Sequence, residues 1–259
     1  MQSALLKTGI RLLKIKTDAY ESLSFIYDEV MKEIDYKVWS DYIIDIAKDY
    51  FTKKNVKVLE LSAGNSKMAK RISKKFPNYI ATDKSYKMLK QGTGIDIRKV
   101  CCDMSVLPFN RKFEFIFSTF DSVNYLLSKK RLLSLFEGVK DVLSEDGIFT
   151  FDVSLEKNSL EFKKNHQTIG STNGYRFKRI SKYYPKSRIH KNIFEITNQF
   201  GIVTQEVHKQ KIYKFDTYFE LIHKAGLSVV ECLDAFTFNN GNQDSERIQF
   251  ILKTNRNKC

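Results

Sequence analysis

The stretch VKVLELSAGNSKMAKRISKKFPNYIATD, residues 56–83, decides the fold. Its apolar run VKVLEL (56–61) predicts a short buried strand, which the small residues SAGNS bring to an end. The segment KMAKRISKKF (67–76) has helical periodicity, and NYIATD (78–83) predicts a second strand. A strand, a helix and a second strand within about thirty residues form the unit from which parallel sheets are built.

The same alternation continues along the chain. The segments KVCCDM (99–104), FEFIFST (113–119) and GIFTFDVS (147–154) predict three further strands, with helices between them. We therefore expect an α/β fold, a doubly wound and mostly parallel Rossmann-like sheet. Residues 175–213 instead alternate polar with aromatic or β-branched residues, which predicts an antiparallel insertion after the fifth strand. A helix over 216–226 and two last strands would complete seven strands.

Three parts of the chain follow from this pattern. We expect N-terminal helices in residues 1–52, the sheet core in 53–154 and 214–254, and an antiparallel cap in 155–213. The first 16 residues hold four basic and no acidic side chains around several leucines and isoleucines. They predict a surface helix, and an amphipathic helix that touches a membrane or a partner is the alternative.

The charge is unevenly distributed. The 259 residues carry a net charge of +14, and residues 151–215 hold 13 basic against 5 acidic side chains. Lysine outnumbers arginine 34 to 10, whereas proteins that read nucleic acid rely on arginine, so a nucleic-acid partner is disfavoured but not excluded. Charge on the cap that faces a cavity would indicate an anionic ligand; charge that faces outward would be a lysine coat.

Several classes are disfavoured. The four cysteines include no CxxC pair, so the sequence predicts neither a disulfide framework nor a metal site. No apolar run approaches the roughly 18 residues that span a bilayer. We expect a soluble protein without a membrane span, in the reducing cytoplasm.

Ligands of a doubly wound sheet bind at the carboxyl ends of the strands. The first such turn contains Ser62, Ala63 and Gly64, which are small enough for a ligand to approach the backbone. The motif G-x-G-x-x-G of dinucleotide sites is absent, and the Glu60 carboxylate would repel a pyrophosphate. A ligand with cationic groups fits this turn better.

The next strand ends carry further polar groups. Asp83 can accept hydrogen bonds from the two hydroxyls of a ribose. Asp103 can accept one from an adenine amino group, while Met104 lies against the ring. Phe120 and Asp121 follow the fourth strand at the mouth of the crevice. In this order, the strand ends describe an adenosine pocket without phosphates.

These segments resemble the motifs of class I S-adenosylmethionine-dependent methyltransferases. VLELSAGNSKMA is similar to their first motif, ATDKSYKML to the second, VCCDMSVLPF to the third, and FEFIFSTFDSVNYL with GIFTFDVS to the fourth and fifth. YESLSFIYDEVMKEIDYKVWSDYI (20–43), DSVNYL and EVHKQKIYKFDTYFELIHKAGL resemble small-molecule enzymes, above all sugar-amine N-methyltransferases. The resemblance implies S-adenosyl-L-methionine as cofactor, covered by the N-terminal helices, and an acceptor pocket closed by the cap.

The resemblance also implies roles for single residues. It assigns to the cofactor Tyr27, Glu60, Ser62, Ala63, Gly64, Asp83, Lys84, Met88, Asp103, Met104, Phe120 and Asp121. Tyr20 would lie near the methyl group or the acceptor, with aromatic packing as the alternative for it and for Tyr27. Tyr20 and Tyr125 are the catalytic candidates. Tyr125 departs from the family, because some sugar N-methyltransferases carry a histidine base at this position. Ser62 and Ser66 depart from the glycines of the first motif.

The expected reaction is in-line transfer of a methyl group to a nitrogen or oxygen of a small molecule, which proximity and alignment can accelerate without a strong base. An RNA or protein methyltransferase is one alternative, because the cap is basic. A non-catalytic protein that binds S-adenosylmethionine is another, because Ser62 and Ser66 replace glycine. The acceptor, the methylated atom and the oligomeric state stay open.

Overall fold

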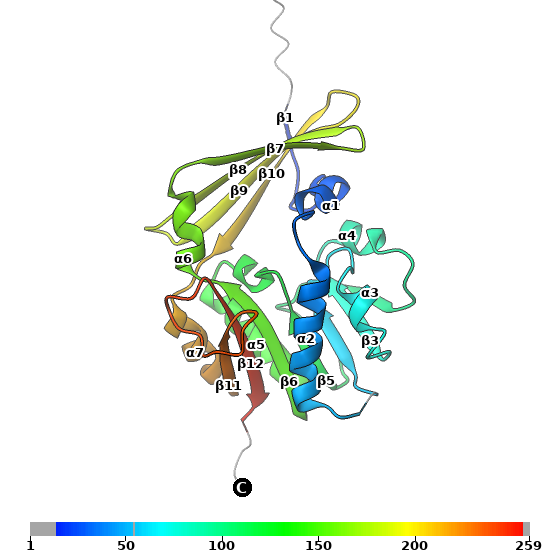
Figure 1. The fold of residues 1–259 in the computed structure, drawn as a ribbon, viewed down its shortest axis with the longest axis vertical. Helices are drawn as coiled ribbons and strands as arrows, with labels where there is room; N and C mark the ends of the chain where they lie inside the picture. Colours follow the sequence, from blue (N-terminus) through cyan, green and yellow to red (C-terminus); the bar gives the residue numbers. More distant parts are fainter. Residues whose placement is uncertain (1–13, 54, 256–259) are drawn as a thin grey trace, which may run out of the picture.

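The larger of two sheets forms the centre of the structure, a computed structural model that describes residues 14–53 and 55–255 (Figure 1). Its seven strands lie in the order β11, β12, β6, β5, β2, β3, β4. They are β2 (Val58–Leu61), β3 (Tyr79–Asp83), β4 (Arg98–Cys101), β5 (Phe113–Ser118), β6 (Leu143–Ser154), β11 (Leu227–Asp234) and β12 (Arg247–Thr254). All neighbours are parallel except β12, which is antiparallel to β6 and β11. The expected doubly wound α/β fold is confirmed.

Helices cover both faces of this sheet (Figure 1). They are α2 (Tyr36–Tyr50), α3 (Ala69–Ile72), α4 (Tyr86–Gln91), α5 (Lys129–Val142) and α7 (Phe215–Lys224). In β5, Phe115 and Phe117 pack with α2 and α3, whereas Ile116 packs with α5 and α7. Alternate side chains of a strand point to opposite faces, so a continuous apolar run is what a strand buried on both faces requires.

Side chains of the preceding residues start two of these helices. The Asp35 carboxylate accepts hydrogen bonds from the backbone N–H groups of Lys37 and Val38, at 2.8 and 3.1 Å. Ser85 Oγ accepts one from the Met88 N–H at 3.3 Å and thereby caps α4.

A second sheet lies beyond the carboxyl ends of the central strands (Figure 1). Its order is β1, β10, β9, β8, β7, and only the pair of β1 and β10 is parallel. The strands are β1 (Lys14–Lys16), β7 (His166–Thr172), β8 (Tyr175–Tyr184), β9 (Ile189–Thr197) and β10 (Val203–Lys211). The antiparallel insertion after the fifth strand is thereby confirmed, and β7 is an additional strand. The boundaries that divide the chain into covering segment, core and cap stay a prediction.

The N-terminal region differs from the helices expected there. Residues 1–13 lie outside the described residues, and Lys14–Lys16 form strand β1. After it come a short 3-10 helix, η1 (Leu23–Ile26), and a single turn, α1 (Tyr27–Val30). The backbone N–H groups of Tyr20 and Leu23 donate to the Glu206 carboxylate, at 2.8 and 2.9 Å. Those donors are held by the second sheet, so residues 18–26 do not form the regular helix that their apolar spacing predicts.

The short α6 (Glu156–Ser159) and η3 (Leu160–Lys163) lead from the core into the second sheet.

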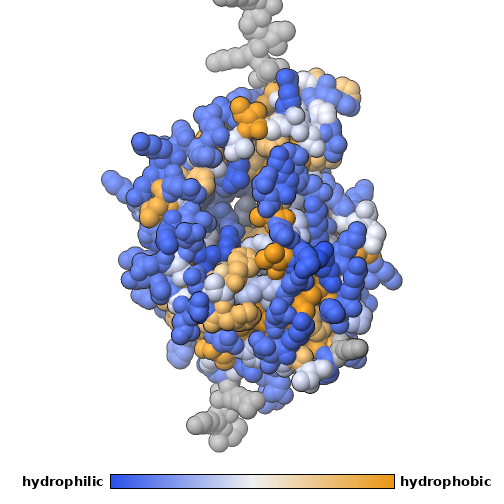
Figure 2. All heavy atoms as spheres, viewed as in Figure 1, coloured by the Kyte–Doolittle hydropathy of each residue, from blue (hydrophilic) through white to orange (hydrophobic). Residues whose placement is uncertain are grey.

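In the view of Figure 1, the surface of the second sheet is mainly hydrophilic, whereas hydrophobic side chains gather lower on this face (Figure 2).

Candidate active site

A cavity of about 930 Å³ lies between the carboxyl ends of the central strands and the second sheet. The fourteen side chains singled out from the sequence all line it: Tyr20, Tyr27, Glu60, Ser62, Ala63, Gly64, Asp83, Lys84, Met88, Asp103, Met104, Phe120, Asp121 and Tyr125. The opposite wall comes from β8, β9 and β10. The structure therefore brings the predicted residues to one place, and their individual roles stay predictions.

The turn after β2 keeps the backbone of a glycine-rich loop. Ser62, Gly64 and Ser66 have φ angles of 57°, 54° and 63°, all in the left-handed region. Glycine adopts this conformation without cost, whereas another residue is strained there by about 1–3 kcal/mol. The left-handed backbone is the physical reason why glycine is expected at the positions of the two serines. The serines adopt the same backbone conformation, so the shape of the turn is retained. A Cβ at Gly64 would lie 3.4 Å from the Cε atom of Met88, one of the residues that line the cavity. The backbone at Gly64 therefore faces the cavity.

Two buried carboxyl groups end β2 and β3. Burial raises the pKa of Glu60 to about 8, although the Tyr79 hydroxyl donates a hydrogen bond to it at 2.7 Å. Burial also raises the pKa of Asp83. The backbone N–H groups of Gly64 and Ser85 donate to the two oxygens of Asp83, at 2.8 and 2.7 Å. The carboxylate is thus held in place, and each oxygen keeps a second lone pair for a ligand.

The carboxylate of Asp103 is already surrounded by donors. The Ser105 hydroxyl donates to it at 2.8 Å, and Lys84 and Arg131 form ion pairs with it at 3.1 and 2.5 Å. Burial would raise the pKa of Asp103, but the hydrogen bonds from Ser105 and the two cations lower it to about 2. Lys84 therefore has a structural partner in addition to any contact with a ligand.

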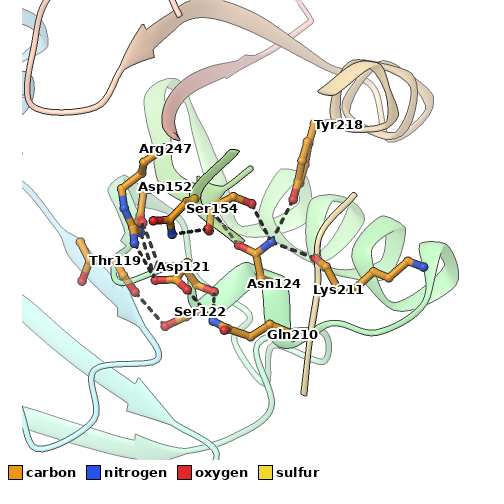
Figure 3. Close-up of polar contacts among 11 residues, drawn as sticks. Thr119, Asp121, Ser122, Asn124, Asp152, Ser154, Gln210, Lys211, Tyr218 and Arg247 are labelled. Atoms are coloured by element: carbon orange, nitrogen blue, oxygen red, sulfur yellow. Dashed lines mark hydrogen bonds and ion pairs between the residues drawn. The ribbon is translucent and has the colours of Figure 1, made fainter. Parts of the chain in front are cut away.

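A network of charged groups forms the turn after β5 (Figure 3). Phe120 and Asp121 both have left-handed φ angles, 62° and 47°. The Arg247 guanidinium is paired with Asp121 at 3.0 Å and with the fully buried Asp152, whose carboxylate accepts the Asp121 N–H at 2.8 Å. Gln210 of β10 also donates to Asp121. Arg247 thereby holds the strained turn that points Asp121 into the cavity.

Asn124 joins the core to the second sheet (Figure 3). Its side-chain oxygen accepts the Ser154 N–H at 3.0 Å. Its Nδ2 donates to the carbonyl oxygens of Ser154 and Lys211, at 3.2 and 2.9 Å. Ser154 ends β6, where the chain leaves the core, and Lys211 ends β10, where it returns. The buried amide of Asn124 therefore connects the end of β6 with the end of β10 through hydrogen bonds.

Two tyrosines meet between the two sheets. The Tyr20 hydroxyl donates to the Tyr125 hydroxyl at 3.0 Å, and the latter lies 3.4 Å from His208 Nδ1. His208 Nε2 is 3.2 Å from the Glu206 carboxylate. Burial would raise the pKa of Glu206, but the hydrogen bonds from His208 and the backbone of Leu23 and Ser22 lower it. Because an ionised carboxylate only accepts, Nε2 carries the hydrogen of His208 and Nδ1 accepts from Tyr125.

Known proteins share this architecture over nearly the whole chain. A protein of Geobacillus sp. (strain WCH70), whose name places it provisionally among the methyltransferases, is 27% identical over 249 residues, 90% of this chain and 99% of its own. An S-adenosylmethionine-dependent methyltransferase from Clostridium acetobutylicum has a TM-score of 0.77 at 24% identity, covering 91% of this chain and 99% of that one. The sugar N-methyltransferase KedS8 from Streptoalloteichus sp. has a TM-score of 0.72 at 12% identity. The match covers 88% of this chain and 92% of that one.

Residues 58–147, from β2 into β6, match the family model of a methyltransferase domain. This segment contains the turn of Gly64 and the strand ends of Asp83, Asp103 and Asp121. The chain therefore contains a methyltransferase domain, in the fold of class I S-adenosylmethionine-dependent methyltransferases. S-adenosylmethionine is the cofactor that the name of the Clostridium neighbour gives.

The strand ends of the methyltransferase fit this cofactor. A positively charged ligand without phosphates calls for open backbone and carboxylates, and the Gly64 turn, Glu60 and Asp83 supply both. The two nearby cations, Lys84 and Arg131, both form ion pairs with Asp103. Within residues 14–53 and 55–255, no group of three or more His, Cys, Asp or Glu side chains is placed to hold a metal ion. No helix of the described part is long and apolar enough to cross a membrane.

The sequence leads us to expect that the cap closes the acceptor pocket, but it does not assign the residues of the cavity wall that the second sheet provides. Arg179, Asn192, Phe194, His208 and Gln210 line it there. The available signal was the period of two in EVHKQK, which places buried His208 and exposed Lys209 on opposite sides of β10. What the period leaves open is which of the two sides faces the cavity.

Proposed function

We propose that this methyltransferase moves the methyl group of S-adenosylmethionine to a nitrogen or oxygen of a small molecule by in-line displacement. The observation that carries the proposal is the cavity itself. Its wall from the second sheet is joined to the core by Asn124, and Tyr20 crosses between the two. A cavity that is walled on two sides in this way suits a small acceptor better than a nucleic-acid or protein chain. The printed name of KedS8, a sugar N-methyltransferase, agrees with an acceptor of this size.

In this proposal the cofactor lies along the strand ends. Gly64 and its neighbours Ser62 and Ala63 border it through their backbone, and Asp83 accepts the ribose hydroxyls. Asp103 and Met104 lie at the adenine, with Lys84 and Met88 beside them. Glu60, Tyr27, Phe120 and Asp121 border the methionine part. All of these side chains line the cavity from the side of the central sheet.

When bound, the cofactor supplies an activated methyl group on a positively charged sulfur that leaves as a neutral thioether. The protein then has to align the acceptor, and alignment can lower the barrier by roughly 7–11 kcal/mol in favourable systems. Tyr20 and Tyr125 provide two hydroxyls for this purpose, 3.0 Å apart in the cavity. Burial raises the pKa of Tyr125 to about 12, so the hydroxyl stays protonated and acts as a hydrogen-bonding group.

The hydroxyls of Tyr20 and Tyr125 also connect the cavity with a group that can accept a proton, the imidazole of His208. Read in order, Tyr20 donates to Tyr125, Tyr125 donates to His208 Nδ1, and His208 Nε2 donates to Glu206. An acceptor N–H or O–H that donates to the Tyr20 oxygen can pass its proton along this chain to Nδ1. The ionised Glu206 then faces the positive imidazolium. His208 from β10 thus supplies the base that position 125 lacks.

A panel of acceptors tests the proposed function. The protein is incubated with S-adenosylmethionine and, separately, with amino sugars, sugar phosphates, phenols, mixed RNA and a mixed-sequence peptide, and S-adenosylhomocysteine release is measured by mass spectrometry. We expect release with one of the small molecules. Release with RNA or peptide only would contradict the small-molecule acceptor. Binding of the cofactor without release in a single-turnover experiment would favour a non-catalytic protein.

Cofactor binding is expected to release a proton from Glu60. With a pKa of about 8 in the free protein, Glu60 is mostly protonated at pH 7, and a nearby cationic ligand favours its ionised form. The apparent affinity should therefore rise with pH up to about 8 and level off above it. Calorimetric titration with S-adenosylmethionine at pH 7 in buffers of different ionisation enthalpy should show close to one proton released. Glu60→Gln should show none; an equal release from both proteins would mean that the proton has another source.

His208→Asn is expected to lower kcat about a hundredfold, the lower range for a lost proton-transfer group. The measurement uses the best acceptor of the panel, provided that this acceptor must lose a proton. KM and the affinity for S-adenosylmethionine should change less than about threefold. Lys209→Asn, one residue away on the exposed side of β10, is the control and should retain full activity. Equal kcat values for the two variants would leave His208 as a packing residue.

A further inference from the structure

One arginine in the cavity has no ionic partner. Of the six lysine and arginine side chains that line the cavity, five form ion pairs with carboxylates of the described chain: Lys67, Lys84, Lys87, Arg131 and Arg247. The sixth, Arg179, forms none with any residue that the structure describes. It lies on β8, in the wall opposite the cofactor turn.

The position of Arg179 is nevertheless well defined. Its Nε donates a hydrogen bond to Asn192 Oδ1 at 2.9 Å, and the same oxygen accepts from the Ser181 hydroxyl at 2.6 Å. Its guanidinium carbon lies 5.8 Å from the ring centre of Phe194. These contacts fix one edge and one face of the guanidinium. Its two terminal NH₂ groups have no hydrogen-bond partner among the described residues and remain available as a fork.

Burial makes this charge costly. Desolvation lowers the pKa of Arg179, and the positive group is only partly offset by its interactions with Tyr125 and Asp121. Asp121 is already paired with Arg247. A buried cation is stable when a counter-charge with matching hydrogen bonds is present. Among the described residues, no carboxylate forms an ion pair with Arg179.

The other lysine and arginine side chains on the strands of the second sheet face away from the cavity. Side chains alternate along β8, so Arg179 and Ser181 face inward while Arg176, which is exposed, faces outward. Lys182, Lys191 and Lys209 lie directly opposite one another on three adjacent strands, in the outward register. The basic surplus of residues 151–215 is therefore mostly an outer coat, and Arg179 is the cation that it places in the cavity.

We propose that Arg179 binds an anionic group, a carboxylate or a phosphate, of the methyl acceptor. The proposal rests on the proposed function, because it assumes that the acceptor lies between the cofactor and the second sheet. The acceptor then carries an amine or hydroxyl that reaches the tyrosine pair and an anion that reaches the arginine fork. Amino acids, hydroxy acids and phosphorylated amines or alcohols are compounds of this class.

Two variants on the same strand test this. Arg179→Gln removes the inward charge, and Arg176→Gln is the matched control that removes an outward one. Inorganic phosphate and acetate are titrated into each protein by calorimetry, with and without saturating S-adenosylhomocysteine. We expect the wild type and Arg176→Gln to bind at least one of the two anions, and Arg179→Gln to bind it at least tenfold more weakly. Arg179→Lys, which keeps the charge without the fork, should fall between them and serves if Arg179→Gln does not fold.

The two anions distinguish an acceptor with a phosphate from one with a carboxylate. Tighter binding of phosphate or of acetate identifies which of these groups the Arg179 guanidinium fits. Absence of binding to the wild type, or equal affinity of Arg176→Gln and Arg179→Gln, would overturn the proposal. The S-adenosylhomocysteine titration of the same proteins reads the cofactor site separately. If the wild type does not bind S-adenosylhomocysteine, that result counts against the proposed function. The anion titrations in the absence of S-adenosylhomocysteine still report on Arg179.

Discussion

Asp83→Ala is expected to reduce the affinity for S-adenosylmethionine about a hundredfold or more. Two hydrogen bonds from the ribose to a charged acceptor contribute about 1.5–3 kcal/mol each, and a factor of ten corresponds to about 1.4 kcal/mol. The loss has a second component, because Gly64 N–H and Ser85 N–H also donate to this carboxylate. Without it, the turn that approaches the cofactor loses its support at the same time.

Calorimetric titration measures this effect. Asp83→Asn keeps one acceptor oxygen and the shape of the side chain, so its affinity should lie between those of Asp83→Ala and the wild type. Asp96→Ala removes an exposed carboxylate from the segment before β4 and should bind like the wild type. If Asp83→Ala kept the wild-type affinity, the assignment of Asp83 to the ribose would be wrong.

Arg247→Met is expected to reduce the free energy of unfolding at pH 8 by about 3–5 kcal/mol, the range observed when one partner of a buried ion pair is removed. Asp152 is fully buried, and Arg247 provides the charge that favours its ionised form against burial. Asp121 loses the same partner while its backbone remains in a left-handed conformation. The substitution therefore leaves two carboxylates close together without a cation.

Urea unfolding of single and double variants checks this account. Asp152→Asn combined with Arg247→Met should recover part of the loss, because a neutral amide no longer has to be buried as an ion. The deficit of Arg247→Met should also shrink as the pH falls, because loss of the cation raises the pKa of Asp152 further and protonation then removes the buried charge. Arg98→Met removes an exposed arginine from edge strand β4 and should change stability by less than about 1 kcal/mol. An equal effect of the two substitutions would contradict the buried-pair explanation.

The part of the site on the central sheet could be predicted from the sequence because each of its residues follows a strand directly. Glu60, Asp83 and Asp103 lie at or just beyond the ends of β2, β3 and β4, and the topology of a parallel sheet brings such positions together whatever the details of packing. The serines at 62 and 66 could be placed in the turn for the same reason, while their left-handed backbone became visible only in the structure.

The remaining part depends on contacts between distant segments. Arg247 is 126 residues from Asp121, and Tyr125 is 83 residues from His208. No periodicity within one segment indicates such a pair. The same holds for residues 18–26, whose apolar spacing predicts a helix but whose backbone donors are held by Glu206 on β10. The sequence showed that β10 has two faces, and only the fold shows which of them the ligand meets.

The position of Asn124 has a consequence for how enzymes of this kind diversify. The carbonyl oxygens of Ser154 and Lys211 accept hydrogen bonds from one nitrogen atom, so the two ends of the inserted segment are neighbours in space. To the core, the insertion is equivalent to a short surface loop, and the length of such a loop has only a weak influence on stability. If the proposed function holds, the part of the protein that borders the acceptor can change in length with little effect on the stability of the core that borders the methyl donor.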